Sequence, residues 1–149
     1  MSEGELTIHV NLGEIASELN HPHDVVSVVE ATARAEAVEA GEISVTFCSM
    51  TAIAELNQKY LNREGSTDVI AFNLGEGGRP LGDVYICPEI ARRSAEEYGV
   101  SPREELLRLV VHGVLHVLGY DHPEGPERAD SEMFRRQEAV LEGLKSPGR

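Results

Sequence analysis

Three of the chain's six histidines lie within the thirteen-residue run VVHGVLHVLGYDH, residues 110–122. His112 and His116 are four residues apart, so on a helix they share one face with Cβ atoms roughly 5–6 Å apart. Gly119 can end the helix in a left-handed conformation, and the turn then carries His122 back toward the other two. Three neutral nitrogen ligands with a fourth position open are typical of a catalytic zinc site. The spacing therefore predicts a metal site formed by His112, His116 and His122.

The same spacing, H-x3-H-x2-G-x2-H, occurs in the metzincin proteases, in which a glutamate after the first histidine acts as the general base. Gly113 occupies that position here and has no side chain to accept a proton. A single histidine on an apolar helix is usually a packed core residue. Three at ligand spacing, with a glycine at the turn, favour a metal site that lacks the base of a peptidase.

The sequence leaves the general acid and base unassigned, although three aspartates are candidates. Asp121 directly precedes His122, where its carboxylate can either bind a ligand imidazole or cap backbone amides. The first role is the prediction, because metal-bound histidines commonly donate a hydrogen bond to a carboxylate. Asp68 and Asp83 are further candidates, and each also suits an ordinary turn or strand end.

The strands that must position these residues follow from the spacing of apolar residues. Alternation of apolar and polar residues predicts strands at 6–12, 42–48, 67–74 and 82–87. The glycines at 75–80 indicate a turn, so the last two strands are expected to form a hairpin.

Helical periodicity and capping residues predict helices at 24–41, 51–60, 88–98, 101–118 and about 127–144. Asp24 and Thr51 are the expected N-caps of the first two, and Gly41 is the expected end of the first. The SPRE sequence at 101–104 is a capping box that begins the histidine-bearing helix, and Gly119 is its expected end. The last helix carries an apolar stripe of Met133, Val140, Leu141 and Leu144.

The length of 149 residues and the hydrophobic fraction of 41% suit one domain with a buried core. The elements predict a single α+β domain over residues 1–149, with a four-stranded sheet flanked by four to five helices. The metal site then lies at the end of a core helix, and residues 145–149 are expected to form a frayed tail.

Composition indicates a soluble, cytoplasmic protein. The N-terminus lacks the basic and apolar regions of a secretory signal, and the longest apolar run, 109–118, is too short to span a bilayer. Cys48 and Cys87 form neither a disulfide framework nor a CxxC pair. The net charge of −13 is unusual for a nucleic-acid-binding protein, although it leaves room for a locally basic cleft.

The run HGVLHVLGYDH closely resembles the YbeY family of metal-dependent endoribonucleases, whose pattern is H-G-x-L-H-x-x-G-Y-D-H. Weaker matches follow in the family's order: Leu56-Asn57 with Tyr60, Thr67-Asp68-Val69 with Phe72, Leu81-Gly82-Asp83, and Met133-Phe134. The resemblance spans roughly residues 43–144, which is most of the chain.

The resemblance implies a small mixed sheet flanked by helices. It also implies a single-strand-specific endoribonuclease that acts in 16S ribosomal RNA 3′-end processing, ribosome maturation and quality control. The family's zinc ligands map onto His112, His116 and His122, so one zinc ion per chain is expected, and another divalent transition metal would also suit. The implied partner is ribosomal RNA or a ribosomal particle, with a ribosomal protein or a GTPase as a further candidate. No membrane or DNA partner is expected.

Two positions depart from the family's pattern. Many members carry an arginine where Leu61 stands, and a serine is usual where Ala71 stands. Arg63, in the same loop as Leu61, is a candidate to contact the substrate phosphate, although a solvated loop arginine is the simpler interpretation. Solvated positions are also expected for the remaining arginines considered, Arg92, Arg93, Arg103 and Arg108.

Three functions remain open on these residues. A metal-dependent endoribonuclease comes first, followed by a zinc hydrolase of another substrate, such as a peptide. The third is a non-catalytic, metal-stabilised ribosome assembly factor. Gly113 argues against a peptidase, and Leu61 mildly favours the assembly factor over an efficient nuclease. An RNA 2′-OH acting as the nucleophile would reduce the need for a water-activating base.

Overall fold

Nine helices and strands make up the computed structural model, which describes residues 5–13, 22–75, 79–120 and 132–144. In chain order they are β1 (Leu6–Asn11), α1 (Pro22–Ala35), β2 (Gly41–Phe47), α2 (Met50–Leu61), β3 (Val69–Asn73), β4 (Leu81–Ile86), α3 (Pro88–Tyr98), α4 (Pro102–Val117) and α5 (Glu132–Leu144). The expected α+β fold, with four strands and five helices, is therefore confirmed.

The four strands form one mixed sheet in the order β1-β2-β4-β3. β1 and β4 both run parallel to β2, whereas β3 pairs with β4 as the antiparallel hairpin that the sequence predicts. In β2 the alternation of apolar and polar residues turns Ile43, Val45 and Phe47 into the core. The sheet is thus mixed, as the resemblance implies.

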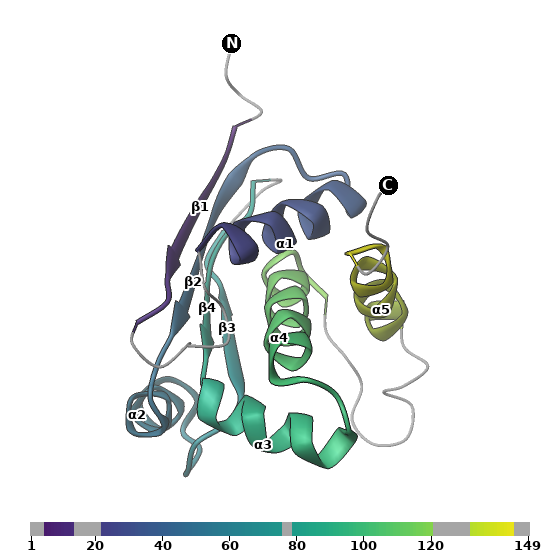
Figure 1. Cartoon of the computed structure of the whole chain (residues 1–149). Coiled ribbons are helices and arrows are strands. Elements are labelled where there is room, and N and C mark those ends of the chain that lie inside the picture. The colour runs from purple at the N-terminus through teal and green to yellow at the C-terminus, as the bar shows by residue number, and fades with distance from the viewer. Residues whose placement is uncertain (1–4, 14–21, 76–78, 121–131, 145–149) are drawn as a thin grey trace.

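Helices α1, α4 and α5 lie on one side of the sheet, with α3 across its lower end (Figure 1). The main core fills the space between these helices and the sheet, and α4 lies at its centre, in contact with β2, β3 and β4 and with α1, α3 and α5. A smaller cluster, built on Ile53 of α2 and Ile70 of β3, occupies the other face. The histidine-bearing helix is therefore the helix most enclosed by the fold.

The boundaries of α4 are those that its capping residues predict. The Ser101 hydroxyl accepts a hydrogen bond from the Glu104 amide at 3.0 Å, and Pro102 occupies the first turn. At the other end Gly119 has a φ of 110°, which a residue with a Cβ rarely adopts. The helix ends at Val117, and the chain turns away at Gly119, three residues after the second histidine of the motif.

Helix α1 differs from the sequence prediction at both ends. It begins at Pro22, so Asp24 lies in its first turn instead of capping it. It ends at Ala35 and not at Gly41, because Ala37 adopts a left-handed φ of 59° and the Val38 amide donates back to the Ala33 carbonyl at 2.8 Å. A run of alanine and glutamate residues gives no sequence signal for this stop.

Two further boundaries need correction. Ser49, not Thr51, caps α2, since its hydroxyl accepts a hydrogen bond from the Ala52 amide at 3.1 Å. In α5, Leu144 is 40% exposed, so the apolar stripe ends at Leu141. The predicted helical residues 127–131 and the predicted tail 145–149 lie outside the described residues.

Candidate metal centre

His112 and His116 lie on successive turns of α4, with their ring centroids 4.7 Å apart and their planes at 78°. Both side chains are half-buried. The structure therefore brings these two predicted ligands together, on the same face of the central helix, as the spacing of four residues requires.

A hydrogen bond orients each of the two rings. The Nδ1 atom of His112 lies 2.7 Å from the side-chain oxygen of Gln137 in α5, and the Nδ1 atom of His116 lies 2.8 Å from the carbonyl oxygen of Tyr120. Carbonyl and amide oxygens only accept hydrogen bonds, so each ring donates from a protonated Nδ1. The Nε2 atom of each ring then carries the lone pair that a metal ion needs.

The remaining predicted members of the site, His122 and Asp121, lie outside the described residues. Within the part of the chain that the structure describes, no three histidine, cysteine, aspartate or glutamate side chains gather to hold a metal. Two neutral imidazoles, each held through Nδ1 by an oxygen acceptor, fit two of the four positions of a zinc ion. The third ligand and the supporting carboxylate stay predictions.

Gly113 has a structural role that the sequence does not reveal. It is buried against β4, and a Cβ atom at this position would lie 2.4 Å from Cγ1 of Val84. The residue thus faces the sheet. The position has no base, and the packing of α4 on β4 leaves no room for one.

The two remaining aspartate candidates occupy different places. Asp83 pairs with Phe72 in the hairpin, and its neighbour Val84 faces α4, so Asp83 points to the opposite face of the sheet. Asp83 is therefore removed as a proton carrier for the histidines. Asp68 precedes β3, and its carboxylate accepts a 3.4 Å hydrogen bond from Thr67.

Asp68 also lies near the first turns of α4, where it affects Glu105. Burial raises the pKa of Glu105, the Arg108 guanidinium opposes this shift, and the Asp68 carboxylate adds to it. The described contacts of Asp68 are therefore with Thr67 and, through its charge, with Glu105 near the start of α4.

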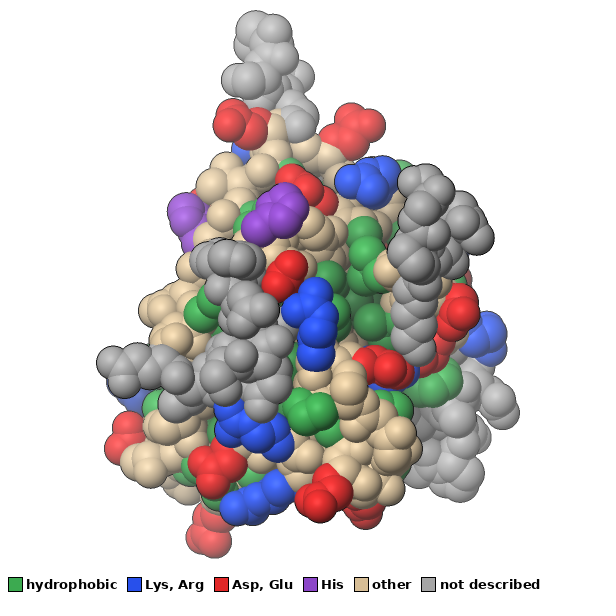
Figure 2. Space-filling view, viewed as in Figure 1, with side chains coloured by type: hydrophobic (Ala, Val, Ile, Leu, Met, Phe, Trp, Pro, Cys, Tyr) green, Lys and Arg blue, Asp and Glu red, His purple; other side chains and the backbone are tan. Residues whose placement is uncertain are grey.

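The described arginines on α3 and α4 with printed contacts are bound to carboxylates. Arg93 pairs with Glu89, Arg103 with Asp24, and Arg108 with three glutamates at the α4–α5 contact. Figure 2 shows lysine and arginine side chains interspersed with acidic ones over the face viewed, without a patch of one sign. These arginines therefore do not form a phosphate-binding patch.

Arg63 is exposed in the loop after α2, where its backbone amide donates to the Asn57 carbonyl at 3.2 Å. The structure describes no hydrogen bond or ion pair from the Arg63 side chain to either histidine. Leu61, which stands where many family members carry arginine, is 41% exposed at the end of the same helix. A substrate-binding role for Arg63 stays a prediction.

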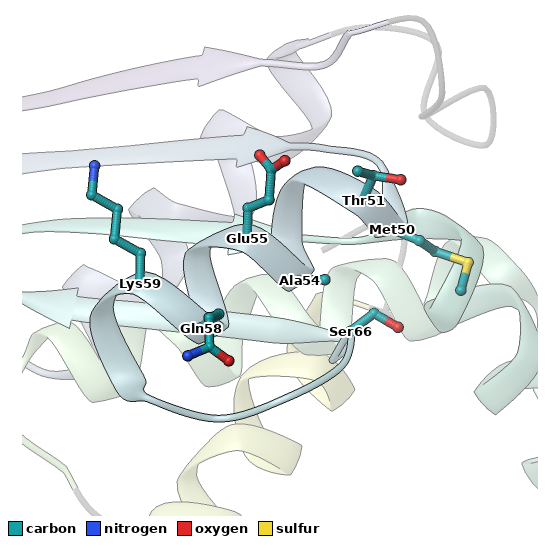
Figure 3. Close-up of a pocket in the computed structure, with 7 residues that line it drawn as sticks. All are labelled: Met50, Thr51, Ala54, Glu55, Gln58, Lys59 and Ser66. Carbon is teal, nitrogen blue, oxygen red and sulfur yellow. The ribbon is translucent and has the colours of Figure 1, made fainter.

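An open groove of about 720 Å³ lies along α2 and includes neither histidine. In Figure 3 Thr51, Glu55 and Lys59 extend from one side of the helix, and Gln58 and Ser66 lie on the other. The lining residues are Met50, Thr51, Ala54, Glu55, Gln58, Lys59 and Ser66. One carboxylate and one ammonium give this groove no net charge to recognise RNA.

Cys48 and Cys87 are free thiols that follow the neighbouring strands β2 and β4. Burial raises the pKa of Cys48 to about 11, and the nearby Cys87 contributes to the shift. A thiol with this pKa is protonated at neutral pH, so Cys48 is a poor nucleophile and a poor metal ligand. The histidines remain the groups best suited to chemistry.

Sequence reasoning missed Gln137, which is only 4% exposed and contacts His112 directly. A signal was present, because Gln137 lies one turn after Met133 and one turn before Leu141, on the apolar stripe of α5. A polar residue in such a stripe needs a buried hydrogen-bond partner. The histidine on the facing helix supplies it.

The chain matches the family model described as endoribonuclease YbeY over residues 8–145. A relative from Staphylococcus carnosus, named endoribonuclease YbeY, is 44% identical over 110 residues, which cover 68% of this chain and 71% of the relative. Another of that name, from Nocardia farcinica, is 39% identical over 145 residues, or 87% of this chain and 78% of the relative.

The fold is also similar to the solution structure of a protein from Thermotoga maritima. The TM-score is 0.64 at 28% sequence identity, and the match covers 97% of this chain and 99% of the other. Together with the family match over residues 8–145, the fold and the paired histidines agree with one assignment. The chain belongs to the endoribonuclease YbeY family.

Proposed function

We propose that the protein is a zinc-dependent, single-strand-specific endoribonuclease that processes the 3′ end of 16S ribosomal RNA in ribosome maturation and quality control. The family supports the nuclease activity, and relatives of about 40% identity carry the name endoribonuclease. The observation that carries the zinc site is the pair of imidazoles on α4, each with its Nδ1 engaged by an oxygen acceptor. His122 is the proposed third ligand.

When bound, the zinc ion supplies a Lewis acid that polarises a phosphoryl oxygen and lowers the pKa of a water molecule toward about 7. The chain's own contribution is to hold His112 and His116 in one tautomer, with the lone pair of each neutral ring on Nε2. The close packing of Gly113 on Val84 fixes the helix that carries both rings. A rigid donor pair avoids reorganisation when the charged phosphate arrives.

Neither Gly113 nor Asp83 can accept the proton, because Gly113 has no side chain and Asp83 faces away. An RNA substrate offers a 2′-OH as an internal nucleophile, which reduces the demand for a protein base. Asp121, beside the proposed ligand His122, is the proposed supporting carboxylate.

The acidic surface favours a substrate presented by a partner. With a net charge of −13, and with Arg93, Arg103 and Arg108 paired to carboxylates, the chain gains little affinity from phosphate neutralisation. A ribosomal particle, through a ribosomal protein or an associated GTPase, would supply the missing affinity in the cytoplasm. Among the described residues, no helix is long and apolar enough to cross a membrane.

One observation favours a second candidate, a metal-stabilised assembly factor without nuclease activity. Leu61 places an exposed apolar side chain where many family members carry an arginine. A peptidase is disfavoured, because the position of its glutamate is Gly113, packed against Val84.

The test compares wild-type protein with His116→Ala and with the control His9→Ala. His9 lies on β1, where it pairs with Glu42 at 2.9 Å, so its loss should leave the metal centre intact. Bound zinc is measured by elemental analysis, and cleavage of precursor 16S ribosomal RNA is followed with and without a chelator. We expect His116→Ala to lose both the bound zinc and the RNA cleavage, and His9→Ala to keep them. Full zinc in His116→Ala contradicts the site, and zinc without cleavage in the wild type selects the assembly factor.

A further inference from the structure

A chain of polar contacts runs from the N-terminal half of α4, across α5, and back to the first histidine. The Arg108 guanidinium donates to both carboxylate oxygens of Glu138, at 2.9 and 3.0 Å. The Gln137 amide nitrogen donates to Glu138 at 2.8 Å, and the Gln137 oxygen lies 2.7 Å from Nδ1 of His112. Arg108 and His112 are one turn apart on α4, so this series of contacts begins and ends on the same helix.

Glu138 determines which end of the Gln137 amide faces the histidine. A carboxylate that binds a guanidinium is ionised and can only accept hydrogen bonds. The amide group that faces Glu138 must therefore be the NH₂ group, which leaves the oxygen toward His112. An oxygen acceptor at Nδ1 requires the proton on that atom. Arg108 thus influences the tautomer of His112 through two intervening side chains.

The two histidines differ in how they are held. His116 donates to a backbone carbonyl, that of Tyr120, which no substitution removes. His112 depends on a side chain from a separate helix, and that side chain is buried, with 4% of its surface exposed. Burial excludes the water that would otherwise replace the Gln137 oxygen as an acceptor.

We propose that Gln137 is a positioning residue that holds His112 in the Nδ1–H tautomer and aims its Nε2 atom at the metal. This inference rests on the metal site of the proposed function. It adds a residue of α5 that does not touch the metal but sets the donor atom of a ligand. Glu138 and Arg108 serve to orient the Gln137 amide.

The experiment uses three variants in α5. Gln137→Met keeps the length of the side chain without an acceptor oxygen, and Gln137→Glu restores an acceptor for Nδ1–H. Val140→Ala is the packing control, because Val140 lies on the buried stripe of the same helix and has no polar atom in its side chain. Urea unfolding confirms that each variant is folded.

Two measurements are made on each protein. Nitrogen-15 NMR of the metal-free protein at alkaline pH reports the His112 tautomer, and competition with a chromophoric chelator gives the affinity for Zn²⁺. We expect Gln137→Met to lose the Nδ1–H tautomer of His112 while His116 keeps its own. Zinc affinity should fall roughly 10–100-fold, the usual effect of removing a hydrogen-bond partner of a ligand. Gln137→Glu should recover the tautomer, and Val140→Ala should change neither.

Two results overturn the inference. One is an unchanged His112 tautomer in Gln137→Met, and the other is an equal loss of zinc affinity in Val140→Ala. Failure of the proposed function gives a different pattern. If the wild type binds no zinc or cuts no RNA, but Gln137→Met still shifts the tautomer, the positioning of His112 stands. If the wild type binds zinc and cuts RNA, but the His112 tautomer is unchanged in Gln137→Met, only the role of Gln137 is refuted and the proposed function stands.

Discussion

Helix α4 has two faces that make different kinds of contact. Toward the sheet it presents Gly113 and Val117, which approach Val84 and Gly82 so closely that an added Cβ at either glycine would clash. Toward α5 it presents Arg108 and His112, which are joined to that helix by hydrogen bonds. One face fits by shape alone, and the other is ordered by donors and acceptors.

The difference separates two tasks that a metal-binding helix must perform. Apolar contact with the sheet fixes where the helix lies, because a well-packed interface tolerates neither an added nor a lost methyl group. Shape alone does not choose the tautomer of an imidazole, so hydrogen bonds on the other face must do this. Substitutions on the sheet face should therefore lower stability through disrupted packing, and those on the α5 face should act through lost hydrogen bonds and ion pairs.

The largest effect is expected from Gly113→Ala on the sheet face. The added Cβ would lie 2.4 Å from Val84, inside any tolerated contact, and both residues are held by the surrounding core. Alanine favours a helix by about 1 kcal/mol over glycine. Overpacking should outweigh this gain and lower the free energy of unfolding by about 2 kcal/mol net. Urea denaturation measures the change.

Gly143→Ala is the matched control, because a Cβ on that residue of α5 meets nothing within 4 Å. Here the helix propensity of alanine should act alone, so the variant should equal or exceed the wild type in stability by up to about 1 kcal/mol. A Gly113→Ala protein as stable as Gly143→Ala would show that the sheet face is not tightly packed.

A smaller effect is expected from Arg108→Met on the α5 face. Methionine keeps a side chain of similar length but lacks the positive charge that pairs with Glu105 and Glu138. The side chains of these two glutamates are 8% and 33% exposed. Removing one partner of a buried pair costs several kcal/mol, and partial exposure of Glu138 reduces this to about 1.5 kcal/mol.

Arg103→Met is the control for an exposed pair. Arg103 binds Asp24 at 3.2 Å, with side chains 47% and 26% exposed, so its loss should cost less than about 0.5 kcal/mol. Thermal unfolding of both variants in the same buffer gives the comparison. Equal costs would mean that the α5 face is no more ordered than the protein surface.

The bounds of α4 and the pairing of its histidines were predictable from sequence, whereas the contacts of its two faces with the sheet and with α5 were not. Periodicity, the SPRE capping box and Gly119 define the helix and place His112 beside His116. These signals are local, since each depends on residues within one or two turns. The tight approach to Val84 is not local, so Gly113 first suggested only the absence of a base.

The partner of His112 depends on where α5 packs, twenty-five residues further along the chain. Gln137 therefore carried no signal that linked it to the histidine, although its place in an apolar stripe marked it as a buried polar residue. Asp83 failed as a candidate for the same reason. Its side chain points away from α4 because its neighbour Val84 packs against that helix, a contact that the sequence does not reveal.

The smallest effect, a change with pH, is expected from Glu105→Gln beside Arg108. Burial raises the pKa of Glu105, so protonated Glu105 favours the folded state, and this contribution is complete below its usual pKa of 4.5. The contribution is lost as pH rises through the raised folded pKa. Glutamine has no such contribution, so the variant should gain stability relative to the wild type between about pH 4 and about pH 7.

The measurement is the difference in unfolding free energy between Glu105→Gln and the wild type, from urea titrations at the two pH values. Carboxylates common to both proteins largely cancel in this difference. A variant that loses stability relative to the wild type as pH rises would show that Arg108, 3.5 Å from Glu105, outweighs burial. Arg108 and Glu105 would then form a stabilising salt bridge, and the Glu105 carboxylate would stay ionised. Arg108 would hold this carboxylate while it also orders Glu138 and Gln137.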